Sequence, residues 1–243
     1  MSAKTGTVKT LVAVLGLLAL AGVFASLGFW QLRRAETSRV TLAQFESGTE
    51  DEVLARLPLT LDDDARFRRV EIGGEYVAQP QFLLDNMVHE GAAGFEVLTA
   101  LRVPGTDQHV LVNRGWVPAR DRSVLPDVAV DAGAWTVTGR LERLPRPGMR
   151  LGEQAVGRGD AVVVLQYPTA VELAQRLGAP VFDYELLLEP AAADGYVRDW
   201  KAPGVAPERH LAYAGQWLAL SLGALAAAIA IGVKTVRAVR RRE

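Results

Sequence analysis

The chain has 243 residues, which allows one ordinary domain together with membrane segments but not two large domains. It contains no cysteine, so disulfides, thiolate metal sites, covalent haem attachment through cysteines and thiol-based copper transfer are excluded. The formal net charge is −1 and 49% of the residues are apolar, but both charged and apolar residues are clustered along the chain.

The first cluster is an uncharged apolar segment over residues 10–32. Because a helix needs about 20 apolar residues to cross ~30 Å of hydrocarbon, this segment predicts a first transmembrane helix. Lys4 and Lys9, followed by the small residues at 19–21, also fit a cleaved signal peptide. The apolar run continues beyond that point to Trp30, at an interfacial position, which favours an uncleaved membrane anchor.

Residues 33–209 form a domain-sized segment. Its first part, 33–47, predicts a continuation of the first helix, and the acidic part 50–64 predicts a solvated loop. Beyond it, short β-type runs alternate with turn signals, and about six to eight strands of an antiparallel sheet or small barrel are expected. The predicted strand runs are 69–72, 75–77, 81–88, 95–103, 110–112, 135–138, 161–165 and 184–188, with turns at 73–74 and 91–94. One soluble helix is predicted, starting at Pro168 or Thr169 and ending at Gly178.

A second uncharged apolar segment, residues 211–233, predicts a second transmembrane helix. Two spans place both tails, 1–9 and 234–243, on one side of the membrane. The tails are basic and residues 33–209 are net acidic, so the positive-inside rule predicts cytoplasmic tails. The predicted fold class is a membrane protein in which two transmembrane α-helices flank a mostly β (α+β) extracytoplasmic domain.

Charge and motifs limit the function classes. An acidic outer domain has no broad attraction for nucleic acid, whereas basic tails indicate contact with anionic membrane lipid. His89 and His109 have no partner at metal-ligand spacing, and no phosphate-binding loop or nucleophile-elbow motif occurs. The sequence therefore disfavours an enzyme.

One less ordinary feature follows the run 110–112, where Asn113, Arg114, Gly115 and Trp116 stand together. In a structural interpretation, Asn113 and Gly115 supply turn geometry and Trp116 fills the core. In a functional interpretation, Arg114 and Trp116 lie at the surface and grip a partner or a cofactor carboxylate.

The second feature opens the second apolar segment. On a helix, His210, Tyr213 and Trp217 share a face, flanked by Gln216. An interfacial aromatic belt explains Tyr213 and Trp217 but not His210. A neutral imidazole in this position could ligate haem iron, and a polar residue near a membrane helix end is a functional candidate.

Four stretches of the chain, in their order, resemble the surfeit-locus family of cytochrome c oxidase assembly factors. They are Leu27-Gly28-Phe29-Trp30-Gln31-Leu32-Arg33-Arg34, Phe67-Arg68-Arg69-Val70 with Gly74-Glu75-Tyr76, Gly94-Phe95-Glu96-Val97-Leu98-Thr99 with Val112-Asn113-Arg114-Gly115-Trp116-Val117-Pro118, and His210 with Tyr213, Gln216 and Trp217. The chain departs from the family pattern at Arg209 (often Asn), Leu218 (often aromatic) and Ala100 (commonly Pro). None of these departures removes a proposed ligand.

The resemblance implies an assembly factor that assists haem a insertion into the catalytic subunit of haem-copper oxidase and binds haem a in passing, with His210 as the iron ligand. The implied location is the bacterial cytoplasmic membrane with two spans, and haem a synthase is a further expected partner. The expected cofactor-binding residues are Arg209, His210, Tyr213, Gln216 and Trp217. The expected partner-binding residues are Trp30, Gln31, Arg33, Asn113, Arg114 and Trp116.

Two details of this expectation remain open at the level of sequence. A haem site between the two membrane helices would shield the macrocycle and leave its propionates near Arg33, Arg34 or Arg209. The alternative is a scaffold without a cofactor, whose outer domain docks oxidase subunits or other assembly factors through Arg114 and Trp116.

Overall fold

The computed structural model describes residues 2–48, 52–119, 121, 124–131, 133–145, 156–157 and 161–241. Its contacts divide the chain into two compact units. One comprises Met1–Ala43 and Ala202–Glu243, and the other Gln44–Lys201.

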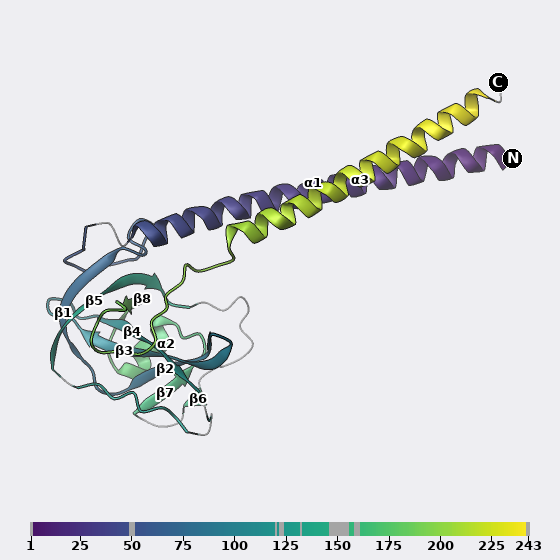
Figure 1. Ribbon diagram of the computed structural model, residues 1–243. Helices are drawn as coiled ribbons and strands as arrows, with labels where there is room; N and C mark the ends of the chain where they lie inside the picture. Colours follow the sequence, from purple (N-terminus) through teal and green to yellow (C-terminus); the bar gives the residue numbers. More distant parts are fainter. Residues whose placement is uncertain are drawn as a thin grey trace. The chain divides into compact units, whose positions relative to one another are not determined.

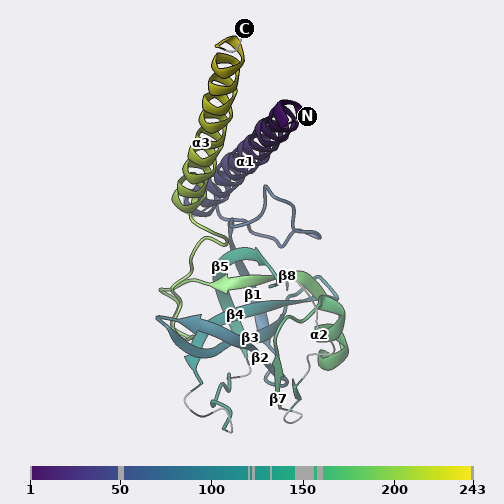
Figure 2. The same cartoon turned by 90° about the vertical axis from the view of Figure 1, so that its right-hand side faces the viewer.

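The first unit is a pair of long helices, α1 (Ser2–Ser47) and α3 (Pro207–Arg240). By length and composition, both helices are able to cross a membrane. The apolar segments predicted at 10–32 and 211–233 lie inside them, and α1 continues through 33–47 as expected. Figures 1 and 2 show α1 and α3 as neighbours that run in opposite directions.

The two helices meet along a seam with the spacing of a coiled coil. Side chains that are buried or half-buried recur at alternating intervals of three and four residues, the repeat that keeps one stripe of each helix against its neighbour. On α1 this seam contains Thr10, Val14, Leu17, Ala21, Phe24, Gly28, Gln31, Ala35 and Ser38. On α3 it contains Pro207, His210, Ala214, Trp217, Ser221, Ala224, Ala228 and Ile231. Small residues dominate, as in membrane helix pairs whose backbones approach closely.

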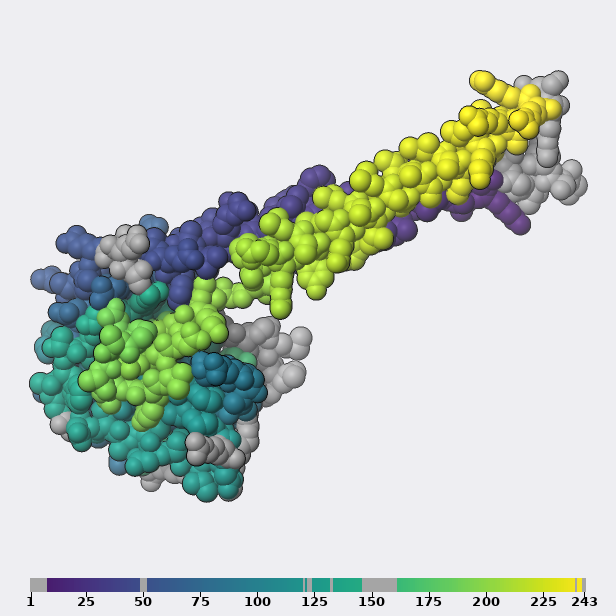
Figure 3. All heavy atoms as spheres, in the orientation of Figure 1, coloured from purple at the N-terminus to yellow at the C-terminus, as the bar shows by residue number. Residues whose placement is uncertain are grey.

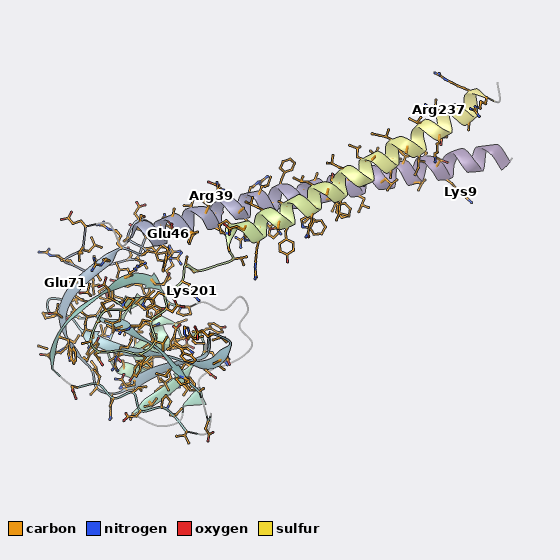
Figure 4. The ribbon with its side chains drawn as sticks, viewed as in Figure 1. Lys9, Arg39, Glu46, Glu71, Lys201 and Arg237 are labelled. Atoms are coloured by element: carbon orange, nitrogen blue, oxygen red, sulfur yellow. The ribbon has the colours of Figure 1, made fainter. Side chains whose placement is uncertain are left out.

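Two contacts fix the antiparallel register of the seam. The Ser221 hydroxyl donates to the Ala21 carbonyl oxygen at 2.8 Å, and the rings of Phe24 and Trp217 lie 5.6 Å apart. In this register the basic ends of the two helices come together, and Lys9 and Arg237 lie at the same end of the pair (Figure 4). The space-filling view shows α3 lying over the middle part of α1 (Figure 3).

The second unit is built around a closed barrel. Its strands are β1 (Arg69–Tyr76), β2 (Gln81–His89), β3 (Ala92–Arg102), β4 (His109–Pro118), β5 (Ala134–Arg143), β6 (Val156–Gly157), β7 (Val162–Leu165) and β8 (Val181–Leu188). The order β1-β5-β8-β4-β3 closes into a five-stranded barrel because β1 also pairs with β3, and β2, β7 and β6 extend the sheet from β3 (Figure 2). The predicted small barrel is confirmed, although β2–β7 and β4–β8 are parallel pairs within an otherwise antiparallel sheet.

Several predicted strand boundaries are wrong; β5 continues to Arg143 and β8 begins at Val181, beyond the predicted runs 135–138 and 184–188. Strand β1 passes through Gly73 and Gly74, because both glycines stay in register with β5. Strand β3 begins at Ala92 rather than after residue 94, since the turn lies at Glu90 and Gly91, both with positive φ. Strand β4 does not end at residue 112 but continues to Pro118.

The predicted soluble helix is confirmed as α2 (Ala170–Leu177). Thr169 caps its N-terminus in a capping box with Glu172, and Gly178 ends it in the left-handed conformation with φ 74°. Leu173 of α2 is fully buried against β2, β3 and β7, in a second core beside the cluster formed by β1, β4, β5 and β8.

Candidate functional site

The helix pair brings two of the predicted residues into direct contact. His210 Nδ1 on α3 lies 2.8 Å from Gln31 Oε1 on α1. Both side chains occupy seam positions and are half-buried. The hydrogen bond therefore joins the first and the last of the four stretches that carry the family resemblance, which are far apart in the sequence.

This contact defines which nitrogen of His210 carries the proton. An amide oxygen can only accept a hydrogen bond, so Nδ1–H is the donor to Gln31. In the neutral imidazole, Nε2 then holds the free lone pair. No hydrogen bond to Nε2 occurs within the part of the chain that the structure describes. One nitrogen is thus anchored and the other is free, which is the usual arrangement of a metal-ligating histidine.

The single helix face predicted for His210, Tyr213 and Trp217 is divided in the structure. His210 and Trp217 are seven residues apart and both lie in the seam. Tyr213, which is 52% exposed, points away from α1. Together with the exposed Arg209 and Gln216 it forms a separate stripe on the flank of α3.

The seam itself has no room for a macrocycle next to this contact. A Cβ atom built on Gly28 would lie 2.8 Å from Leu218 Cδ2, and Ala214 is 1% exposed. The two helices are therefore in van der Waals contact less than one turn from Gln31. The packing therefore leaves no space for a macrocycle between the two helices at this point of the seam.

The exposed surface of the two helices carries further polar and aromatic groups in the turns that contain Gln31 and His210. Trp30 is 53% exposed, and Arg33, Arg34 and Arg209 are also exposed. None of these arginines has an ion-pair partner among the described residues. An apolar ring beside free guanidinium groups matches a ligand with an apolar body and carboxylate substituents.

The residues present fit a haem held by one axial ligand. His210 would provide the axial nitrogen, and the exposed Arg33, Arg34 and Arg209 would be available for the propionates. Among the described residues no group of three or more His, Cys, Asp or Glu side chains could hold a metal ion.

The barrel assigns a different role to the predicted partner-binding residues Asn113 and Arg114. Asn113 is fully buried, and its Nδ2 donates to Glu96 at 2.7 Å and to Glu185 at 3.1 Å. Arg114 is 2% exposed and forms an ion pair with Asp194 at 2.8 Å. The surface position predicted for Arg114 is therefore wrong, since its guanidinium is used to hold a neighbouring segment of the domain.

Gly115 and Trp116 complete this structural role. Gly115 has φ 111°, and a Cβ there would lie 2.7 Å from the Val197 carbonyl oxygen, so only glycine allows the segment around Val197 to pair with Trp116. The Trp116 indole donates to the Met87 carbonyl oxygen at 3.1 Å and lies over Gly94. The structural interpretation of this motif is supported, but it acts as an irregular strand rather than as a turn.

Sequence reasoning missed the carboxyl pair Glu96 and Glu185. Burial raises the pKa of both groups, and the nearby Glu96 raises the pKa of Glu185 further, while the hydrogen bonds from Asn113 oppose the shift. No sequence signal could have found this pair, because Glu185 comes from β8, which pairs with β4 only after the barrel closes.

Fold and site together define a β-barrel protein with two long helices that are able to cross a membrane and are joined by a hydrogen bond between His210 and Gln31. The SURF1 family matches residues 18–222, so the chain belongs to this family, which consists of oxidase assembly factors rather than enzymes. The family predicted from the four stretches is thereby confirmed. The chain is also similar to a SURF1-like protein of Monosiga brevicollis, at 30% identity over 144 residues. That alignment covers 54% of each protein, and so spans about half the length of the relative.

Proposed function

We propose that this protein is an assembly factor for haem-copper cytochrome c oxidase that holds haem a through His210 and assists its insertion into the catalytic subunit. The observation that carries the proposal is the hydrogen bond from His210 Nδ1 to Gln31, which leaves Nε2 free. Membership of a family of oxidase assembly factors supports the same role.

The position of His210 suits the transfer of haem a to another protein better than its permanent storage. The close approach of the helices at Gly28 supports a proposed site on the outer side of the helix pair, where the catalytic subunit could approach it. Haem a is largely apolar, so its passage through water is costly, and a site on a membrane helix avoids that cost. A single axial ligand lowers the barrier to release.

The proposed topology follows from charge. Lys9 and Arg237 lie at the same end of the helix pair, which is the end expected to face the cytoplasm of a bacterial cell. The barrel then lies on the opposite side of the membrane. Haem a synthase, which would supply the cargo, and the catalytic subunit, which would receive it, are the proposed partners.

The test is complementation in a cell that makes haem a and lacks its own copy of this protein. The haem a content of the purified oxidase is measured with the wild type, with His210→Ala and with His89→Ala as a histidine control in the barrel. We expect full haem a content with the wild type and His89→Ala, and a several-fold loss with His210→Ala.

Full restoration by His210→Ala would refute haem binding through this residue. It would instead favour a scaffold without a cofactor that docks oxidase subunits through the outer surface of the barrel. Arg114 is unsuited to such docking because it is buried.

A further inference from the structure

We infer that Gln31 is a positioning residue, which fixes the tautomer and the ring orientation of His210 so that Nε2 is presented to the iron. The inference rests on the proposed function for its purpose. Its structural content, the control of a histidine tautomer from the opposite helix, does not depend on haem.

The geometry of the contact determines which ring nitrogen of His210 carries the proton. Gln31 Oε1 lies 2.8 Å from His210 Nδ1 and accepts its proton, which leaves Nε2 as the nitrogen with the lone pair. In an unconstrained neutral histidine the proton prefers Nε2, the nitrogen that a ligand needs free. The hydrogen bond from Gln31 therefore reverses the intrinsic preference of the ring.

Stabilisation of the helix pair alone does not explain a glutamine at this place. Hydrogen bonds between membrane helices contribute little to their association, and most of the seam is built from small or apolar residues. Gly28 and Ala35, the neighbouring seam positions on α1, are both buried and neither has a polar side chain. The role of the Gln31 amide that the structure shows is its hydrogen bond to His210 Nδ1.

The hydrogen bond from His210 to Gln31 should also affect how strongly His210 binds a metal. A hydrogen bond to the second ring nitrogen raises the basicity of the ligating nitrogen, and its removal typically lowers metal affinity by about 10–100-fold. A stronger acceptor increases this effect and stabilises the oxidised iron. Gln31→Glu should therefore lower the midpoint potential of a bound haem, and Gln31→Met should raise it.

The first experiment needs no haem. Full-length protein labelled with ¹⁵N at histidine is studied in detergent at about pH 8.5, where an ordinary histidine is neutral. The chain has three histidines, so the signal of His210 is assigned by its loss in His210→Ala. We expect the Nδ1–H tautomer in the wild type and in Gln31→Glu, which keeps an acceptor oxygen. In Gln31→Met, of similar length but without an acceptor, the Nε2–H tautomer should become the major form.

The matched control is Gln216→Met, which makes the same chemical change on the exposed flank of α3. It should leave the His210 tautomer unchanged. The inference is overturned if the wild type shows the Nε2–H tautomer, or if Gln31→Met and Gln216→Met both show the wild-type spectrum.

The second experiment adds haem a and separates this inference from the proposed function. Affinity and midpoint potential are measured for the wild type, Gln31→Glu and Gln31→Met. A loss of about 10–100-fold in affinity with Gln31→Met, together with opposite shifts in potential for the two variants, supports the positioning role. If the tautomer changes as expected but no variant binds haem a, the tautomer control by Gln31 stands and the proposed function fails. Equal potentials in all three proteins would contradict the role of Gln31 towards the iron.

Discussion

Arg114 carries a positive charge inside the barrel domain and is neutralised there by Asp194 at 2.8 Å. Its Nη1 also donates to the carbonyl oxygen of Val128 at 3.1 Å, and its guanidinium lies 5.2 Å from the ring of Tyr196. These contacts attach two irregular segments to β4. The charge therefore has a structural use, and its loss should affect stability before it affects any partner.

Replacement of Arg114 by methionine tests this use. The variant keeps most of the side-chain volume but leaves the half-buried Asp194 without its cation and removes the hydrogen bond to Val128. We expect the free energy of unfolding to fall by roughly 3 kcal/mol, the scale found when one partner of a buried ion pair is removed. Chemical denaturation of the detergent-purified protein measures it.

The control is Arg102→Met, which breaks the exposed pair of Arg102 and Glu75. A change within about 1 kcal/mol is expected there, because exposed ion pairs contribute little. Equal effects of the two substitutions would contradict the structural role of Arg114.

The buried Glu185 should make the stability of the folded protein depend on pH, and the direction of this dependence can be predicted. Burial and the nearby Glu96 raise its pKa well above the ordinary value, so the folded protein binds this proton more tightly than the unfolded chain does. The stabilising contribution is complete at a pH below the unfolded pKa and is lost as the pH rises through the folded pKa. Stability should therefore decline towards neutral pH on account of this group.

Glu185→Gln keeps an acceptor for Asn113 and removes the charge. We expect a more stable protein at pH 7 and a weaker fall in stability between about pH 4 and pH 7 than in the wild type. Thermal unfolding at several pH values measures both, with Glu90→Gln, at an exposed carboxyl, as the control. A less stable Glu185→Gln variant at pH 7 would contradict the assignment.

At the scale of elements, the seam between α1 and α3 depends on a close approach at Gly28. Leucine at this position would collide with Leu218 and push the helices apart. Gly22→Leu is a matched control, because no neighbouring atom lies within 4 Å of a Cβ built on Gly22. Separation at Gly28 should also break the hydrogen bond between Gln31 and His210.

Cross-linking tests the seam directly, since the native chain has no cysteine. Cysteines placed at Ala21 and Ser221, which are already in contact, should form a disulfide in the otherwise unchanged protein. We expect this cross-link to persist in Gly22→Leu and to be strongly reduced in Gly28→Leu. An equal yield in both would show that Gly28 does not control the approach.

Elements also show what the sequence could predict. Both apolar helices and α2 with its caps were predictable, because spacing and capping residues are local signals. The division of the His210 face was not, since the three-and-four spacing of the seam becomes visible only when α1 supplies the partner. The continuation of β4 through Asn113 and Arg114 was also not predictable. The side chains that bind these two residues, Glu185 and Asp194, lie far away in the sequence.

At the scale of the whole molecule, the chain forms two compact units. The helix unit contains the proposed ligand His210 and its anchor Gln31. The barrel unit closes through the pairing of β1 with β3 and has its own cores. The sequence predicted a small barrel or sheet, but not the closure of the barrel or its two parallel strand pairs. The pairing of strands that are far apart in the chain has no local sequence signal.

The central claim is that His210 holds haem a. The most direct measurement is the absorption spectrum of the full-length protein, purified in detergent from cells that synthesise haem a. A reduced haem a band, present in the wild type and in Tyr213→Phe but lost in His210→Ala, is the predicted result. The same band at full strength in His210→Ala, or no band in the wild type, would contradict it.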